Sequence, residues 1–240
     1  MFEFYRTRSD LPFPQSISTA LRAFRNNQIP VDPVIFRAGS ADTMFQQPLN
    51  VALLKEIFAK SGLDTEINKK IARILFSYVG NEDQEISDFA AQYLSKLEER
   101  YLKAIRLQEE DEPETVEQKL KLAHLYFDFS AIEQFNPTLQ RFYLNKSDAV
   151  VRNLLDSTPE ALYLKARIAL TLGRIEETES IMNSSPYPKS EEGLLILAEA
   201  AFLRRDITVV YRLVEEIAGM SGAERSAETT DFINQWRRYE

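Results

Sequence analysis

The most constraining feature of the sequence is an internal similarity at a spacing of 32 residues. The first copy, residues 159–182, reads PEALYLKARIALTLGRIEETESIM, with small residues at Ala166 and Ala169 and Gly173 at a predicted turn. Small residues let two helices approach closely, and such a unit needs stacked neighbours to cover its apolar face. The second copy places Arg205-Asp206 at the turn and has seven matching apolar or small residues: Leu194, Leu197, Ala198, Ala201, Ile207, Val210 and Val214.

A third copy precedes these two and is distorted. Its first helix is predicted to contain four packing residues: Leu122, Ala123, Tyr126 and Phe127. Its second helix comes after a longer connection and supplies four more: Phe142, Ala149, Leu154 and Leu155. An ordinary helical bundle whose spacing imitates a repeat is the alternative, but two adjacent copies favour a repeat.

Apolar residues recur with the 3.6-residue period of a helix after Pro48, and no sustained stretch alternates with a period of two. This pattern predicts an all-α fold. We expect helices at residues 49–60, 65–79, 84–108, 114–132, 138–156, 160–172, 175–184, 191–204, 207–218 and 226–238.

The copies after residue 113 resemble tetratricopeptide (TPR) repeats, in which each unit is a pair of antiparallel helices. The acidic turn at 81–85, with apolar residues after it at Ile86, Phe89 and Leu94, resembles the second helix of a HEAT repeat. Together these resemblances imply an α-solenoid of antiparallel helix pairs. Its expected parts are an aromatic, proline-containing N-terminal arm over 1–47, a HEAT-like segment over 48–112, and TPR-like repeats with a C-terminal capping helix over 113–240.

The order of the parts resembles a narrower family over roughly residues 65–218. DQEISDFAAQYLSKLEERYLKAIR (83–106) is succeeded by an acidic linker, LKLAHLYFDF (120–129), LQRFYLNKSDAVVRNLL (139–155) and then the TPR-like units. This order is similar to the cytoplasmic part of PelE-type proteins of bacterial Pel exopolysaccharide machinery. The resemblance implies a scaffold without catalytic residues or cofactors. Its implied partners are a membrane-bound glycosyltransferase and transporter complex and a cyclic-di-GMP receptor.

The resemblance also implies a cytoplasmic protein held at the inner membrane through its partners. The membrane helices of the family have no counterpart in this sequence, whose longest apolar run, 194–198, is far below the about 20 residues that span a bilayer. Three other functions stay open: a generic cytosolic TPR adaptor, a self-associating assembly protein, and an all-α saccharide hydrolase.

Composition argues against several classes of function. The chain has no Cys, a single His and no glycine-rich phosphate loop, which disfavours thiolate chemistry, zinc sites and nucleotide binding. With 29 basic and 37 acidic residues, the net charge of −8 repels nucleic acid. We therefore expect a non-catalytic protein-binding chain with no metal site.

The repeat register predicts a partner-binding groove. The groove-facing positions are Leu120, His124, Phe127, Tyr163, Arg167, Leu170, Leu195, Glu199 and Phe202. This mixed, partly apolar surface suits a helix or strand of a partner better than a charged peptide terminus. The alternative is that Phe127, Leu195 and Phe202 pack against a capping helix. For His124, a polar contact is a simpler role than catalysis.

The N-terminal arm is the second candidate surface, because aromatic residues and Arg dominate the energetics of protein interfaces. Either the arm docks on a partner, or it caps the solenoid. The acidic run at 109–114 is interpreted as a solvated turn between helices, with an acidic docking surface as the alternative. The candidate residues of the arm are Phe2, Phe4, Tyr5, Arg6, Arg8 and Phe13.

Overall fold

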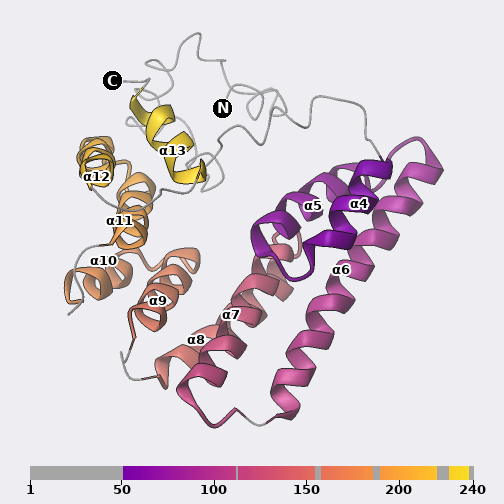
Figure 1. Ribbon diagram of the computed structural model, residues 1–240, viewed down its shortest axis with the longest axis horizontal. Helices are drawn as coiled ribbons and strands as arrows, with labels where there is room; N and C mark the ends of the chain where they lie inside the picture. Colours follow the sequence, from indigo (N-terminus) through magenta and orange to yellow (C-terminus); the bar gives the residue numbers. More distant parts are fainter. Residues whose placement is uncertain (1–50, 112, 155–157, 186–189, 221–226, 238–240) are drawn as a thin grey trace. The chain divides into compact units, whose positions relative to one another are not determined.

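A computed structural model describes residues 51–111, 113–154, 158–185, 190–220 and 227–237. The described residues form ten α-helices and no strand, which confirms the predicted all-α class. Each predicted helix is found, with ends that differ by a few residues. The helices are α4 (Val51–Ser61), α5 (Thr65–Tyr78), α6 (Gln84–Glu110), α7 (Val116–Ile132), α8 (Pro137–Arg152), α9 (Pro159–Thr171), α10 (Ile175–Asn183), α11 (Glu191–Leu203), α12 (Ile207–Gly219) and α13 (Ala227–Arg237) (Figure 1).

Local capping explains the positions of most helix starts. A polar side chain accepts a hydrogen bond from a first-turn backbone N–H at seven starts, as Thr115 does from Gln118 in a capping box. Proline stands at the start of α8 and α9, where its missing N–H costs nothing. The seven capping residues are Asp64, Asp83, Thr115, Asn136, Thr158, Ser190 and Asp206.

The chain forms two compact units that divide in sequence between Leu172 and Gly173. The described helices α4–α9 belong to one unit and α10–α13 to the other. This division falls inside the first predicted repeat, whereas residue 112, the predicted domain boundary, lies within the first unit. The reason is that α6 and α7 pack against each other and share one core across residue 112.

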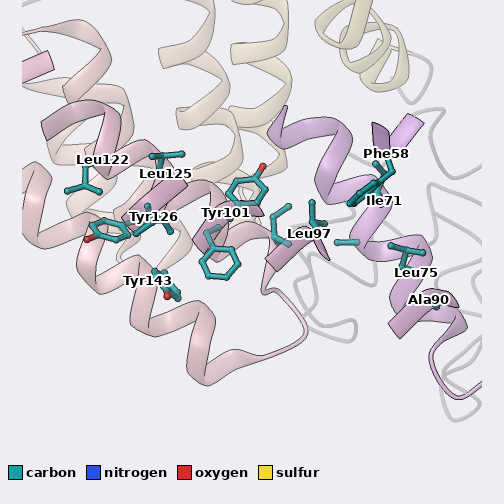
Figure 2. Close-up of a cluster of buried hydrophobic side chains, with 14 residues drawn as sticks. Phe58, Ile71, Leu75, Ala90, Leu97, Tyr101, Leu122, Leu125, Tyr126 and Tyr143 are labelled. Carbon is teal, nitrogen blue, oxygen red and sulfur yellow. The ribbon is translucent and has the colours of Figure 1, made fainter. Parts of the chain in front are cut away.

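The first unit is built around a continuous row of apolar side chains (Figure 2). The 27-residue helix α6 contributes one face to this row, with Ala90, Leu97, Tyr101 and Ile105 fully or almost fully buried. Helix α5 packs on α6 and α7, and α7 packs on α8 and α9. Burial of each large apolar side chain contributes about 1.5–3 kcal/mol, so this row supplies much of the stability of the unit.

The closest pairing in this unit joins α7 and α8. Ala123 has no exposed surface, and the fully buried Ser147 of α8 donates its hydroxyl to the Ala123 carbonyl oxygen at 2.7 Å. The predicted packing face of α8 is shifted, because Phe142 and Ala149 are exposed. The residues that face the core are instead Tyr143, Leu144, Ser147, Asp148 and Val151.

A cationic side chain of α6 caps the C-terminal end of α4. Arg100 of α6 donates to the carbonyl oxygens of Gly62 (2.8 Å) and Phe58 (3.2 Å) and to the hydroxyl of Ser61 (3.0 Å). Its guanidinium also lies 4.1 Å from the centre of the Phe58 ring. The last carbonyl groups of a helix lack hydrogen-bond partners within the helix and carry a partial negative charge. Arg100 supplies both hydrogen-bond donors for these groups and a positive charge beside them.

The second unit has its own core between α11, α12 and α13. The Trp236 ring lies edge-on to Phe202 of α11 at 6.0 Å and to Tyr211 of α12 at 5.5 Å, measured between ring centres. Helix α13 thereby covers apolar side chains of both preceding helices. The fully or nearly fully buried members of this core include Leu194, Ala198, Ala201, Ile207, Val210, Val214 and Ile217.

The two predicted repeat turns share an unusual backbone conformation. Gly173 has φ 76° and Arg205, 32 residues later, has φ 65°. Arg205 is the one described residue other than glycine with a positive φ. The two turns therefore share a positive φ at this position, although Arg205 has a Cβ atom.

No helix in the described part of the chain is both long and apolar enough to cross a membrane.

Candidate interaction surface

The predicted groove residues of α7 lie where α7 meets α9. Leu120 is buried in a cluster with Leu154, Ala161 and Ile168, and the half-buried Phe127 packs against the same cluster. The face of α7 that was expected to line a groove is therefore partly covered by α9. Leu120 is a core residue rather than a surface contact.

His124 faces Glu160 in the first turn of α9, with Nε2 and Oε1 3.2 Å apart. The contact becomes an ion pair when the imidazole is protonated, but its geometry does not satisfy a hydrogen bond at Nε2. His124 therefore makes a polar contact between α7 and α9. A carboxylate near an imidazole is not sufficient for catalysis, which needs a reacting group within hydrogen-bond reach.

The remaining groove positions are half-buried or buried within their own units. On α9, Tyr163 and Arg167 are half-buried and Leu170 is buried. On α11, Leu195 and Glu199 are half-buried, whereas Phe202 is only 4% exposed and lies against Trp236. Leu170 and Phe202 thus belong to the cores. Phe202 thus packs against α13, as the alternative from the sequence expects, and Leu195 packs against the same core.

The six candidate residues of the N-terminal arm lie outside the described residues: Phe2, Phe4, Tyr5, Arg6, Arg8 and Phe13. Their role as a contact surface stays a prediction.

Three helices are joined by a charged cluster near the end of α6. Glu109 accepts a short hydrogen bond from the Tyr126 hydroxyl of α7 and pairs with the Lys146 ammonium of α8 at 3.0 Å. The hydrogen bond from Tyr126 and the pairing with Lys146 lower the pKa of Glu109, while burial and then Glu109 raise the pKa of Tyr126. Both groups keep a single protonation state near neutral pH, so the cluster serves as a clamp rather than as an acid–base pair.

Glu133 is the described carboxyl group with the largest perturbation. It caps the end of α7 and is 7% exposed. Burial and, after it, the negative charge of Glu98 raise the pKa of Glu133 to about 7. Its charge therefore changes within the physiological pH range, which makes it a candidate for pH-dependent stability.

A shallow hollow of about 460 Å³ lies between the end of α6 and the start of α7. Its lining is polar and mostly acidic: Glu110, Asp111, Glu114, Thr115 and Gln118. No group of three or more described His, Cys, Asp or Glu residues has a metal-binding arrangement. The acidic run thus forms the expected turn between two helices, and the alternative of an acidic docking surface stays a prediction.

An exposed apolar surface lies at the ends of α5 and α7. The rings of Phe76 in α5 and Phe135, in the turn after α7, stack with their centres 3.8 Å apart and an angle of 4° between their planes. Both rings stay exposed, Phe76 at 44% and Phe135 at 38%, and Val79, at the end of α5, is 46% exposed. We call Phe76, Val79 and Phe135 the Phe76–Phe135 patch. Two stacked aromatic rings at the surface are a typical element of a protein interface.

Matching the sequence to a helical repeat does not identify this patch, because a repeat is matched at its core positions and the patch residues are exposed. A signal for it exists in the sequence. Phe135 is a large aromatic residue in the short polar turn Glu133-Gln134-Phe135-Asn136, where burial within a helix pair is not expected. Phe76 comes directly after the core residue Leu75 and so points about 100° away from the core direction on the helix.

No protein-family model, no curated protein and no solved structure matches the chain. The resemblance to PelE-type proteins therefore stays a prediction from the sequence.

Proposed function

We propose that the chain is a non-catalytic scaffold that binds other proteins, and that the Phe76–Phe135 patch is one of its binding surfaces. The exposed stacked pair carries this proposal. Each ring covers one face of the other and leaves further apolar surface in contact with water. A partner that covers this surface gains about 25 cal/mol for each Å² of apolar area removed from water.

The packing of the first unit supports a solenoid as the form of this scaffold. Helix α7 contacts its sequence neighbours α6 and α8 and also α5 and α9, two elements away. Contacts of each first helix with its own partner and with the next first helix are typical of stacked helical repeats. The packing of α11 against α12 across the turn at Arg205 supports the same interpretation for the second TPR-like copy.

The resemblance of the parts to PelE-type proteins supports a bacterial exopolysaccharide assembly as the setting. Under this proposal the partners are a membrane-bound glycosyltransferase and transporter complex, together with a cyclic-di-GMP receptor. The scaffold itself stays in the cytoplasm and reaches the inner membrane through them. A generic adaptor or a self-associating protein is the competing outcome.

The test is a quantitative affinity purification of the tagged full-length chain from its native cells, in separate membrane and soluble fractions. Three forms are compared: the wild type, the double variant Phe76→Ser/Phe135→Ser, and the control Phe142→Ser. Phe142 is 51% exposed on α8 and lies outside the patch. Circular dichroism and thermal melting establish that all three forms are folded.

We expect the wild type and Phe142→Ser to recover the same proteins, including a glycosyltransferase and a transporter in the membrane fraction. The double variant loses them. Equal recovery by all three folded forms would show that the patch does not bind these proteins. Recovery of the chain alone, as a multiple of its own mass, would favour self-association.

A further inference from the structure

An acidic turn, residues 81–85, adjoins the Phe76–Phe135 patch. Val79, the last patch residue at the end of α5, is followed by Gly80 and then by this turn, which leads into α6. The Gly80 backbone N–H donates to the hydroxyl of Ser87 at 3.0 Å, which holds the turn against the first residues of α6. The acidic turn therefore lies directly beside the α5 end of the patch.

The two stretches that carry the patch are rich in negative charge. Residues 74–95 contain four acidic residues and no Lys or Arg, and residues 129–140 contain one acidic residue and no Lys or Arg. Arg73, the cation that precedes the first stretch, is half-buried. Glu82 and Glu85 of the turn are exposed, and neither forms an ion pair with any described residue. Two carboxylates at the rim of the patch can therefore pair with cations of a partner.

The stacked rings offer flat faces to a partner. Phe76 and Phe135 cover one face of each other, so the exposed area of each ring lies on its outer face and edge. The planar guanidinium of an arginine stacks on such a face and also forms paired hydrogen bonds with a carboxylate, whereas a lysine ammonium is a point charge. The chain shows this stacking at Arg100, whose guanidinium lies 4.1 Å from the centre of the Phe58 ring. Flat aromatic faces beside exposed carboxylates thus favour arginine.

The charge of this surface argues against two other occupants. A second copy that met it patch to patch would bring Glu82 and Glu85 of both copies together, and like charges across an interface are destabilising. An anionic membrane surface would meet the same repulsion, although exposed aromatic rings suit a membrane interface. A positively charged segment of another protein meets neither obstacle.

We propose that the Phe76–Phe135 patch and the acidic turn bind a positively charged segment of another protein, in which arginine stands beside apolar anchors. The anchors cover the rings and supply most of the binding energy. The arginine pairs with Glu82 or Glu85 and sets the orientation and the speed of association. This proposal rests on the proposed function, because it names the kind of partner segment that the same surface takes.

The test is a selection of peptides from a library of random linear sequences displayed on phage, with the immobilised full-length chain as the target. Three forms are compared: the wild type, Phe76→Ser/Phe135→Ser and Glu82→Lys/Glu85→Lys. We expect the wild type to select peptides in which Arg lies within a few residues of an aromatic or aliphatic side chain. Phe76→Ser/Phe135→Ser should lose these peptides. The charge-reversed form should lose them too and select acidic peptides with similar apolar anchors.

A matched control carries the same change of net charge elsewhere on the first unit. Glu99→Lys/Glu117→Lys reverses two exposed carboxylates, and Glu117, like Glu85, lies in the first turn of a helix. Glu99 lies near the middle of α6, and Glu117 is about 20 Å from the end of the 17-residue helix α7. This control should select the same peptides as the wild type. Circular dichroism establishes that all four forms are folded.

A synthetic peptide of the selected sequence gives the quantitative measurement. At low salt its association rate should fall about 10-fold or more when Glu82 and Glu85 are reversed, and the difference should shrink as salt is added. Replacement of its Arg by Lys should weaken binding to the wild type, because Lys lacks the planar group that stacks on a ring.

Three results of the selection would overturn the proposal: patch-dependent peptides without an excess of Arg, Arg-containing peptides that the charge-reversed form binds equally well, or no patch-dependent peptide at all. Light scattering tests a second copy as the occupant, and a wild-type dimer that Phe76→Ser/Phe135→Ser abolishes would also overturn it. If the peptide results fail while the patch variant still loses its partners from native cells, the proposed function stands and this proposal does not.

Discussion

At the scale of single residues, Glu133 links burial to pH. Its pKa is raised from 4.5 to about 7 by burial and by Glu98. Between these two values the folded chain holds a proton that the unfolded chain releases. The free energy of unfolding therefore falls as the pH rises from about 4.5 to about 7, and changes little through this group above that window.

We expect Glu133→Gln, which stays neutral, to be more stable than the wild type at pH 8 by about 2–3 kcal/mol. The difference shrinks as the pH falls towards 4.5. Urea denaturation at a series of pH values measures it. Glu98→Gln should shift the wild-type transition to lower pH, because it removes the neighbouring charge. Parallel stability curves for wild type and Glu133→Gln would contradict the assignment.

The two residues with positive φ in the repeat turns give a paired test. Gly173→Ala should destabilise the chain by about 1 kcal/mol, since a Cβ atom at φ 76° strains the backbone although no other atom lies within 4 Å of its position. Arg205→Gly should stabilise it by up to about 1 kcal/mol, because the strain at φ 65° disappears.

Gly219 provides the control for this pair. It ends the helix α12, has no positive φ and has open space around its Cβ direction. Gly219→Ala should therefore be neutral or slightly stabilising in the same denaturation experiment. A loss at Gly219 equal to that at Gly173 would show that backbone conformation does not explain the effect.

At the scale of elements, α13 is expected to act as a cap on α11 and α12. Trp236→Ala removes contacts with Phe202, Tyr211 and Phe232, and should cost about 3–5 kcal/mol in the second unit. Hydrogen exchange measured residue by residue should show faster exchange in α11 and α12. Met220→Ala, at a 37% exposed position, is the control and should change exchange little.

Helix positions were predictable from the sequence because their signals are local. Each of Thr115, Thr158 and Ser190 caps a helix within a few residues of itself, and the apolar period marks the extent of that helix. The packing face of α8 was not predictable in this way. Matching to a repeat favoured Phe142, whereas the buried face contains Ser147, whose hydroxyl finds a partner only after α7 and α8 have come together. A hydrogen bond across helices leaves no signal in the period of one helix.

The candidate surface was predictable only in part, because it also depends on contacts between helices. The repeat register placed Leu120, Leu170 and Phe202 in an open groove, but their exposure depends on which neighbouring helix covers them. The Phe76–Phe135 patch joins two elements distant in sequence, and only the fold brings the rings together.

At the scale of the whole molecule, the two units have separate buried cores. We expect Phe129→Ala, at a 1% exposed position of the first core, to speed hydrogen exchange in α5–α8 and to leave α11 and α12 unchanged. Trp236→Ala should produce the reverse pattern. If either substitution sped exchange in both units equally, the division between Leu172 and Gly173 would have no thermodynamic meaning.

We expect the first unit to carry a surface that binds other proteins. The most direct test of this expectation is hydrogen exchange of the full-length chain, measured free and in the complex recovered from native cells. We predict that the complex slows exchange in residues 76–85 and 133–136, around the Phe76–Phe135 patch and the acidic turn. Slower exchange confined to α10–α13, with these two stretches unchanged, would contradict it.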